Sequence, residues 1–161
     1  MSVNRYLPHI MVLPEDDANR QLANGFQMDS QLDTRRMQVL PEAGGWTAVL
    51  DRFRNDHIAA MQSYPKRLMV LLIDFDERQD RISEVKAVIP LNLKDRVFVL
   101  GSWSEPERLR QQLGGFEEVG GLLAKDCREN ADATWNHELL RHNAEELQRL
   151  REQARAILFQ P

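Results

Sequence analysis

The segment over residues 66–76, KRLMVLLIDFD, constrains the fold more than any other part of the chain. Six consecutive apolar residues, 68–73, are separated from Pro65 by two basic residues. Two aspartates with one residue between them follow the run. An apolar run of this length, bounded by a breaker and by charge, predicts a strand that is covered on both faces, as in a parallel sheet. We therefore expect this segment to be a central buried strand.

Acidic residues follow this strand and one other. Because side chains alternate in direction along a strand, we expect Asp74 and Asp76 to leave its carboxyl end on the same side, close enough to share a divalent cation. A first strand, expected over residues 7–13, is followed by Glu15. Ligands of parallel sheets bind beyond the carboxyl ends of the strands. The sequence therefore predicts that Glu15, Asp74 and Asp76 converge on one magnesium or manganese ion.

Apolar periodicity divides the rest of the chain into alternating strands and helices. Short apolar runs bounded by turn residues predict strands, and apolar positions at helical spacing predict helices. The expected strands cover residues 7–13, 37–40, 68–73 and 96–100. The expected helices cover residues 18–26, 46–61, 80–88, 105–113, 116–127 and 135–159. This alternation predicts an α/β fold: a mainly parallel, Rossmann-like sheet flanked by helices, with a helical C-terminal extension.

Two of the helix predictions depend on particular signals. Ser104, followed by Pro106 and Glu107, matches a capping box, so a helix is expected to begin at Glu105. The last expected helix, residues 135–159, carries a leucine stripe that needs a partner on the domain or on another chain. This helix is therefore a candidate surface for self-association or for a protein partner.

Length and composition limit the class of protein. A chain of 161 residues fits one α/β core, residues 1–115, with a helical extension, residues 116–161, packed on the core or on a partner. No apolar run approaches the ~20 residues of a membrane span, and the amino terminus lacks a secretory pattern. With one cysteine, Cys127, no internal disulfide forms, and we expect a cytoplasmic protein. The formal net charge of −4 limits any nucleic acid contact to a local site.

The acidic residues carry a family resemblance. A strand ending at Glu15, a second strand followed by Gly44-Gly45 and a helix, and a third strand ending in Asp74 and Asp76 together resemble the TOPRIM domain. That domain occurs in topoisomerases, primases and the overcoming-lysogenisation-defect nucleases. The resemblance covers about residues 7–88 and implies the same α/β fold.

The resemblance also implies a function. It makes Glu15 a general acid or base and metal ligand, while Asp74 and Asp76 hold Mg²⁺ or Mn²⁺ during cleavage of a phosphodiester bond. Asp17, after the first strand, and Gly44 and Gly45, after the second, are candidate supporting residues of the site. The implied protein is a metal-dependent nuclease or nuclease subunit that contacts nucleic acid through a local site.

Two alternatives stay open. Asp16 and Asp17 after the first strand, with Asp74 after the third, resemble the phosphorylation site of a response-regulator receiver domain. A receiver also needs a lysine after its last strand, whereas here the chain continues with Gly101-Ser102. The second alternative is a non-catalytic protein-interaction module on a similar scaffold.

Three other reactive side chains are interpreted as structural. His137 and His142 are five residues apart, which separates them by about 140° around a helix, so they do not form a zinc-protease pair. We expect both to lie on a solvated helix face. Cys127 has no local histidine or second cysteine and is expected to have a packing role.

Overall fold

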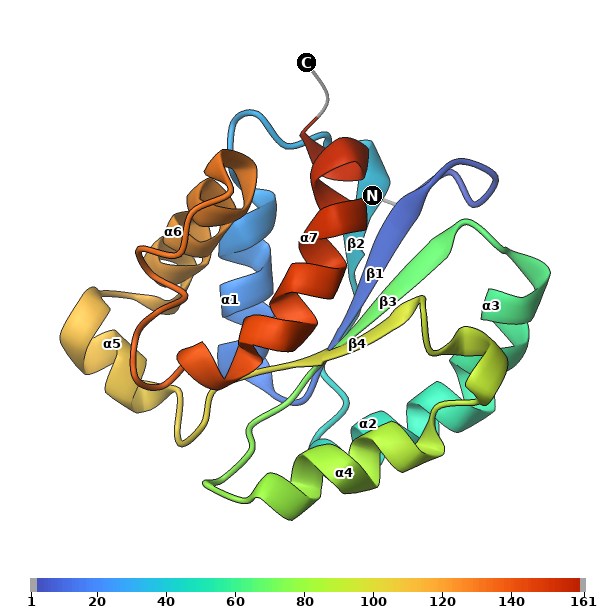
Figure 1. Cartoon of the computed structure of the whole chain (residues 1–161), viewed down its shortest axis with the longest axis horizontal. Coiled ribbons are helices and arrows are strands. Elements are labelled where there is room, and N and C mark those ends of the chain that lie inside the picture. The colour runs from blue at the N-terminus through green and yellow to red at the C-terminus, as the bar shows by residue number, and fades with distance from the viewer. Residues whose placement is uncertain (1–2, 160–161) are drawn as a thin grey trace.

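The four predicted strands form one all-parallel sheet with helices on both faces (Figure 1). The computed structural model describes residues 3–159. Its strands lie in the order β2-β1-β3-β4 and are β1 His9–Pro14, β2 Met37–Val39, β3 Arg67–Leu72 and β4 Val97–Leu100. The expected α/β fold is therefore confirmed.

The two middle strands explain why the central run is uniformly apolar. β1 and β3 pair along six residues each, from His9 opposite Arg67 to Pro14 opposite Leu72. All six residues of β1 and the first five of β3 are buried. A strand in this position is covered on both faces, so each of its faces must be apolar.

Alternate residues of the strands contribute to two separate hydrophobic clusters. Ile10 and Val70 belong to the cluster under α1 (Asp17–Gln27), α6 (Phe116–Glu129) and α7 (Ala144–Leu158). Met11, Leu71 and their neighbours belong to the other cluster. This second cluster packs under α2 (Trp46–Arg52), a π-helical turn (Phe53–His57), α3 (Ile58–Ser63) and α4 (Gln79–Val88). Figure 1 shows these two helical layers on opposite sides of the sheet.

Helices α1 and α6 pack closely because glycines remove side chains from their interface. A Cβ atom on Gly25 would lie 2.1 Å from the carbonyl oxygen of Glu117, and one on Gly120 would lie 2.1 Å from that of Leu22. Neither backbone could tolerate a larger residue without moving. The amino-terminal part of the predicted extension thus packs directly on a helix of the core.

Side chains of α7 and of the residue that precedes it pair with the backbone at the outer edge and end of β4. The Glu146 carboxylate accepts the Val99 N–H at 2.9 Å, and Asn143 exchanges hydrogen bonds with the N–H and carbonyl of Gly101 at 3.1 and 3.0 Å. An unpaired edge strand exposes backbone groups that can recruit another chain. Here these side chains take the place of a further strand.

The helix before α6 begins later than its sequence signal predicts. Helix α5 covers Glu107–Leu113, and Pro106 rather than Ser104 precedes it. The predicted capping box is wrong because the Ser104 hydroxyl accepts a hydrogen bond from Arg108 Nη1 at 3.2 Å instead of capping the backbone.

The last helix is also shorter than predicted. A single helix over residues 135–159 was expected, whereas α7 begins at Ala144 and the short 3₁₀ turn Arg141–Asn143 precedes it. The Asp126 carboxylate accepts the N–H groups of Thr134 and Trp135 at 2.6 and 3.1 Å. These tertiary bonds hold the start of the segment in a turn.

Candidate metal centre

The candidate site lies where the carboxyl ends of β1 and β3 meet. After β1 the chain crosses to β2 on one side of β1, and after β3, the neighbour of β1 on its other side, it crosses to β4 in the opposite direction. The loops that leave β1 and β3 therefore diverge, and such switch points are where parallel sheets bind ligands. Glu15 directly follows β1, and Asp74 lies two residues beyond β3.

Three carboxylates meet at this point. Glu15, Asp16 and Asp74 each offer one oxygen, and these oxygens lie within 4.8 Å of one another. We call these three residues the acidic cluster. Carboxylate oxygens are the ligands that Mg²⁺ and Mn²⁺ prefer in proteins. The separation is compatible with a single cation bound between them.

Asn19 ties two members of the acidic cluster together. Asp16 is the N-cap of α1 and its Oδ1 accepts the Asn19 N–H at 3.0 Å. The Asn19 side-chain amide also donates to Asp16 Oδ1 at 2.9 Å and to Asp74 Oδ1 at 3.0 Å. Asn19 is fully buried, and its own Oδ1 has no hydrogen-bond partner among the residues described. This amide oxygen is a further buried acceptor beside the cluster.

Glu15 is held by the backbone of two loops. Its Oε2 accepts the Asp74 N–H at 2.7 Å, and its carbonyl accepts the N–H groups of Gly44 and Gly45 at 2.8 and 3.1 Å. Gly44 and Gly45 have φ angles of 99° and 137°, in the region that favours glycine. The glycine pair thus contacts the site through the main chain of Glu15.

Burial, together with neighbouring carboxylates, raises the pKa of two members of the cluster. Burial raises the pKa of Asp74 to about 7; the Asn19 hydrogen bond opposes this shift, and the negative charges of Glu15 and Asp16 add to it. Burial also raises the pKa of Glu15, against the hydrogen bond from the Asp74 N–H. Both shifts arise first from burial and then from neighbouring negative charge, and a bound cation would favour the charged carboxylates against both.

Arg81 lies beside the cluster and was not found from the sequence. Its Nη1 donates to the Asp74 carbonyl at 2.9 Å, and its guanidinium lies 4.7 Å from the centre of the Trp46 ring. The charge of Arg81 lowers the pKa of Glu15, in opposition to burial. In sequence, Arg81 is one of many charges on an amphipathic helix, so no local signal distinguishes it. Asn19 likewise shows no signal before the fold is known.

Two of the predicted acidic residues lie outside the acidic cluster. The Asp76 side chain is 68% exposed, and its Oδ2 lies 3.9 Å from Arg81 Nη2. Asp76 and Glu77 both have positive φ angles, of 53° and 59°, so the chain turns here and strand alternation no longer governs side-chain direction. Asp17 is also largely exposed and pairs with Arg20 on the surface of α1. Asp16 therefore occupies the place in the cluster that alternation assigned to Asp76.

The histidine and cysteine predictions have different outcomes. His142 was expected on a solvated helix face, but its ring packs against Phe75 and Trp103, with centroids 5.2 and 5.3 Å apart. That prediction is wrong because residue 142 lies in the turn before α7, against the loop after β3. Burial lowers the pKa of His142 to about 4. Cys127 is buried, as its predicted packing role requires, and burial raises its thiol pKa to about 11.

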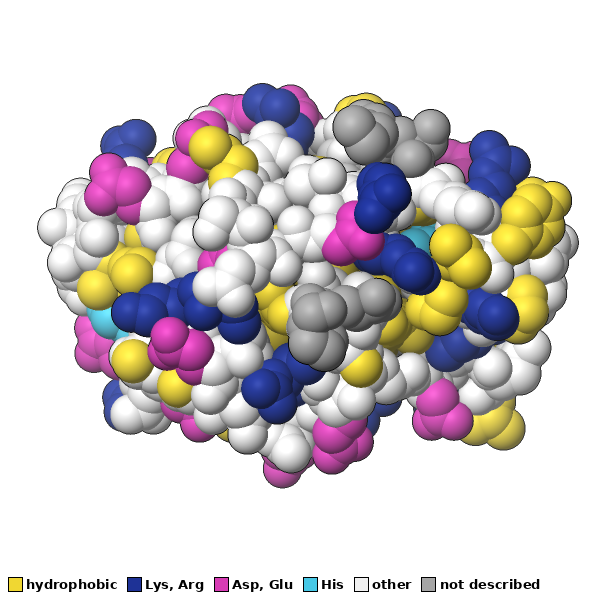
Figure 2. Space-filling model, turned by 90° about the horizontal axis from the view of Figure 1, so that it is seen from above, with side chains coloured by type: hydrophobic (Ala, Val, Ile, Leu, Met, Phe, Trp, Pro, Cys, Tyr) yellow, Lys and Arg dark blue, Asp and Glu magenta, His cyan; other side chains and the backbone are white. Residues whose placement is uncertain are grey.

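Comparison with protein-family models, curated proteins and solved structures gave no match to this chain. Within residues 3–159, no helix combines the length and apolar character needed to cross a membrane. On the face seen in Figure 2, basic and acidic side chains are interspersed. The acidic cluster is thus the feature described here that indicates a binding site.

Proposed function

We propose that this chain is a TOPRIM-like, Mg²⁺- or Mn²⁺-dependent protein that acts on phosphodiester bonds, as a nuclease or as a nuclease subunit. The observation that carries this proposal is the meeting of three carboxylate oxygens within 4.8 Å at the switch point of the sheet. A hard cation at such a site binds the oxygens of a phosphate group and neutralises their charge.

Each member of the acidic cluster, and two residues beside it, has a role in the proposed function. Asp16 and Asp74 hold the cation, and Asn19 keeps their carboxylates together. Glu15 is a ligand of the cation. It is also the proton acceptor, because its raised pKa makes it a stronger base than an ordinary glutamate. Arg81 fixes the Asp74 backbone and places a positive charge beside the site.

Nicking of supercoiled plasmid in the presence of Mn²⁺ tests this proposal. Glu15→Gln should lose nicking and retain a Mn²⁺-dependent rise in melting temperature, since the amide is nearly isosteric but cannot exchange a proton. Asp17→Asn is the matched control, because Asp17 is a nearby acid at the start of α1 that lies outside the cluster. A wild-type protein that neither nicks DNA nor responds to Mn²⁺ would contradict the proposal.

A receiver-like phosphoacceptor is the second candidate. The composition of the cluster favours it: two acids follow β1, one aspartate follows β3, and the strand order β2-β1-β3-β4 is that of flavodoxin-like sheets. The pair after β1 is Glu15 and Asp16 rather than Asp16 and Asp17. In this candidate Asp74 is the acceptor of the phosphoryl group.

Acetyl phosphate with Mg²⁺ distinguishes the two candidates. The receiver-like function predicts acid-labile phosphate on wild-type protein, none on Asp74→Asn, and intact plasmid DNA. The nuclease function predicts nicked DNA and no phosphoprotein. If neither reaction occurs and no cation binds, the non-catalytic interaction module is the function that survives.

Sedimentation tests separately whether the chain self-associates through its C-terminal helix. The expected surface for self-association was the C-terminal helix, and the buried residues of α7 include Leu147, Ala154 and Leu158. Because these residues pack within the chain, truncation after Asn130 is expected to produce insoluble protein. A soluble truncated monomer derived from a full-length dimer would instead assign α7 to self-association.

A further inference from the structure

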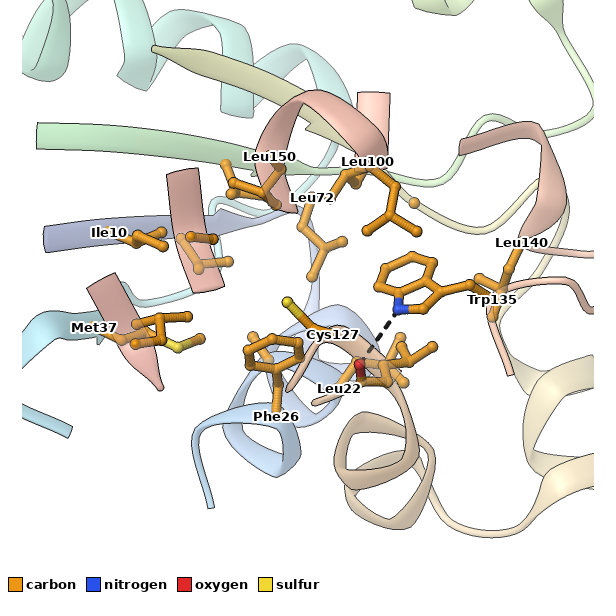
Figure 3. Close-up of a pocket in the computed structure, with 18 of the residues that line it drawn as sticks. Ile10, Leu22, Phe26, Met37, Leu72, Leu100, Cys127, Trp135, Leu140 and Leu150 are labelled. Carbon is orange, nitrogen blue, oxygen red and sulfur yellow. Dashed lines mark hydrogen bonds between the residues drawn. The ribbon is translucent and has the colours of Figure 1, made fainter. Parts of the chain in front are cut away.

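A cavity of about 90 Å³ lies between the sheet and the layer formed by α1, α6 and α7 (Figure 3). Its lining is largely apolar, and the indole N–H of Trp135 donates to the Leu123 carbonyl at 3.3 Å, the dashed line in Figure 3. A cavity that binds benzene has a volume of about 150 Å³, so this one is too small for a ligand of that size. The amino end of the sheet, by contrast, carries a surface suited to a larger ligand.

Basic and aromatic side chains gather at this amino end. They come from two segments that lie side by side in Figure 1, the loop before β1 and the loop between α3 and β3 with the first residue of β3. The first segment contributes Arg5 and Tyr6, and the second contributes Tyr64, Lys66 and Arg67. We call these five residues the basic–aromatic patch. Figure 2 shows apolar and basic side chains next to one another at the right of the face drawn.

Tyr64 joins the two segments of the patch. Its hydroxyl accepts a hydrogen bond from Arg5 Nη1 at 3.2 Å, and the guanidinium carbons of Arg5 and Arg67 lie 5.5 and 5.2 Å from the centre of its ring. The Tyr6 and Tyr64 rings meet edge to face, with centroids 6.0 Å apart and planes at 72°. Cation–π and edge-to-face contacts are both favourable. The side chains of the patch are therefore held in a defined arrangement.

Tyr6 remains open to solvent within this arrangement. Its side chain belongs to a residue that is 76% exposed, and the neighbouring Leu7 is 41% exposed. An edge-to-face contact covers at most one face of either ring, so a face of Tyr6 stays accessible. Accessible aromatic faces beside cations are the surfaces on which the bases of single-stranded nucleic acids stack.

The positive charge of the patch is not neutralised by carboxylates. None of the ion pairs found within residues 3–159 includes Arg5, Lys66 or Arg67. Arg5 and Arg67 instead bond to the Tyr64 hydroxyl and to His9 Nε2. Burial lowers the pKa of Arg67, and the positive charge of Arg5 lowers it further. A chain with a net charge of −4 thus keeps a local surface that attracts a polyanion.

We propose that the basic–aromatic patch binds single-stranded nucleic acid, with phosphates contacted by Arg5 and Lys66 and a base stacked on Tyr6. A single strand offers phosphate oxygens and open base faces together, whereas a duplex encloses its bases. The exposed Tyr6 ring favours nucleic acid over an acidic peptide, whose carboxylates would contact the cations alone.

Binding at the patch does not depend on phosphodiester cleavage. The patch lies at the opposite end of the six-residue strand β1 from the acidic cluster, a separation of about 20 Å along the strand. Neither the three carboxylates nor a cation between them contributes to the patch. Binding can therefore be measured in EDTA, where no metal-dependent reaction takes place.

Fluorescence anisotropy of the full chain with labelled single strands in EDTA tests the proposal. The first probe is an oligothymidylate of about ten nucleotides, within the usual site sizes of single-strand binding proteins. The second is an abasic strand of the same length, which has the same phosphates and no bases. Wild-type protein should bind both and should bind oligothymidylate about tenfold more tightly, because one base stacks on an aromatic ring.

Two substitutions separate the base contact from the phosphate contact. Tyr6→Ala should raise the Kd of oligothymidylate about tenfold, to that of the abasic strand, and leave abasic binding unchanged. Lys66→Ala should weaken binding of both strands and make the slope of log K against log salt shallower by about 0.7, the value for one phosphate of a single strand.

Each substitution has a matched control. Met28→Ala removes another large side chain that is exposed, and Lys125→Ala removes an exposed lysine of α6. Both lie outside the patch and should leave both affinities unchanged. Because Tyr6, Lys66 and the two control residues are all exposed, we expect the four variants to keep the fold.

Two outcomes would overturn the proposal. One is an absence of oligothymidylate binding by wild-type protein at low salt, a measurement that needs no variant. The other is equal binding of oligothymidylate, the abasic strand and a glutamate peptide of the same length, which would make the patch a surface for acidic proteins. Neither outcome affects Mn²⁺-dependent nicking, since that reaction belongs to the acidic cluster.

Discussion

The two ends of the sheet differ in how their buried polar groups are satisfied. At the amino end, His9 is fully buried and both of its ring nitrogens have partners: Nδ1 lies 2.7 Å from the Leu7 carbonyl, and Nε2 accepts from Arg67 Nε at 2.9 Å. Arg96 donates to the carbonyls of Tyr64, Arg67 and Met61 at 3.0 to 3.2 Å. The chain itself thus supplies the partners at this end.

At the carboxyl end, acidic side chains lie next to one another instead of next to basic partners. The carboxylates of Glu15, Asp16 and Asp74 gather within 4.8 Å, and Asn19 Oδ1 and Arg81 Nε are buried without a hydrogen-bond partner among the residues described. Stable proteins satisfy buried polar groups, and departures from that rule concentrate at functional sites. The difference supports the proposal that the carboxyl end binds a cation, whereas the paired groups of the amino end contribute to stability.

The largest expected effect is at the amino end. His9→Ala should lower the free energy of unfolding by about 4 kcal/mol, because it removes the partner of a buried arginine and leaves a cavity. Urea denaturation followed by circular dichroism measures this change. His137→Ala is the control, since His137 bonds to Gln112 near the surface, and should change stability by less than about 1 kcal/mol. A similar loss in both variants would contradict the role of the His9–Arg67 pair.

The second effect is at the carboxyl end. At a Mn²⁺ concentration about a hundredfold above Kd, wild-type protein should gain about 3 kcal/mol of stability. Asp74→Asn should lose this gain, whereas Asp76→Asn should retain it, because Asp76 lies outside the acidic cluster. Thermal melting over a series of Mn²⁺ concentrations checks both variants. Equal losses in the two variants would instead favour the metal site predicted from strand alternation.

The third effect is a pH dependence in metal-free protein. Folding raises the pKa of Asp74 from the ordinary 3.8 to about 7, so the folded state binds more protons than the unfolded state in this window. The contribution of Asp74 to stability is therefore lost as pH rises from about 4 to 7. The full shift corresponds to about 4 kcal/mol, and because Asp74 is only partly buried we expect about half of this after solvent screening. The stability of Asp74→Asn relative to wild type should therefore rise by about 2 kcal/mol over this window and then become constant. A difference independent of pH would contradict the shifted pKa.

The smallest effect has the opposite sign and involves His142. Burial lowers its pKa to about 4, so the unfolded state binds the additional proton between pH 6.5 and 4. Wild-type stability should therefore fall by about 1 kcal/mol relative to His142→Phe as pH falls through this window, after allowance for solvent screening. Denaturation of both proteins at several pH values gives the difference. A relative loss on raising the pH would reverse the predicted sign.

The strands and helices were largely predictable, because buried segments carry apolar patterns that can be recognised locally in the sequence. Apolar runs gave all four strands to within a few residues, and residues 46–61 form the helical segment from α2 through the π-helical turn to α3. The start of α7 was not predictable. It depends on Asp126 and Gly101, which bind the preceding turn from distant parts of the chain.

The candidate site was predictable in part. The positions of Glu15 and Asp74 follow from strand ends in one sheet, and strand ends are local features. Asn19 and Arg81 reach the site from α1 and α4, and nothing in their immediate sequence distinguishes them from other polar residues of amphipathic helices. Their roles became visible only when the helices were placed on the sheet.

The sequence by itself determined that parallel strands would bring acidic residues to one edge, since apolar periodicity specifies which segments are buried. Only the tertiary structure decided which acids meet there. After β3 the chain is held by hydrogen bonds from Phe75 N–H to Ser102 and from Glu77 N–H to Trp103, and it turns at positive φ between them. That turn leaves Asp76 in solvent, while the cap of α1 brings Asp16 to Asp74 through Asn19. Contacts between distant segments fix these directions, and no local pattern records them.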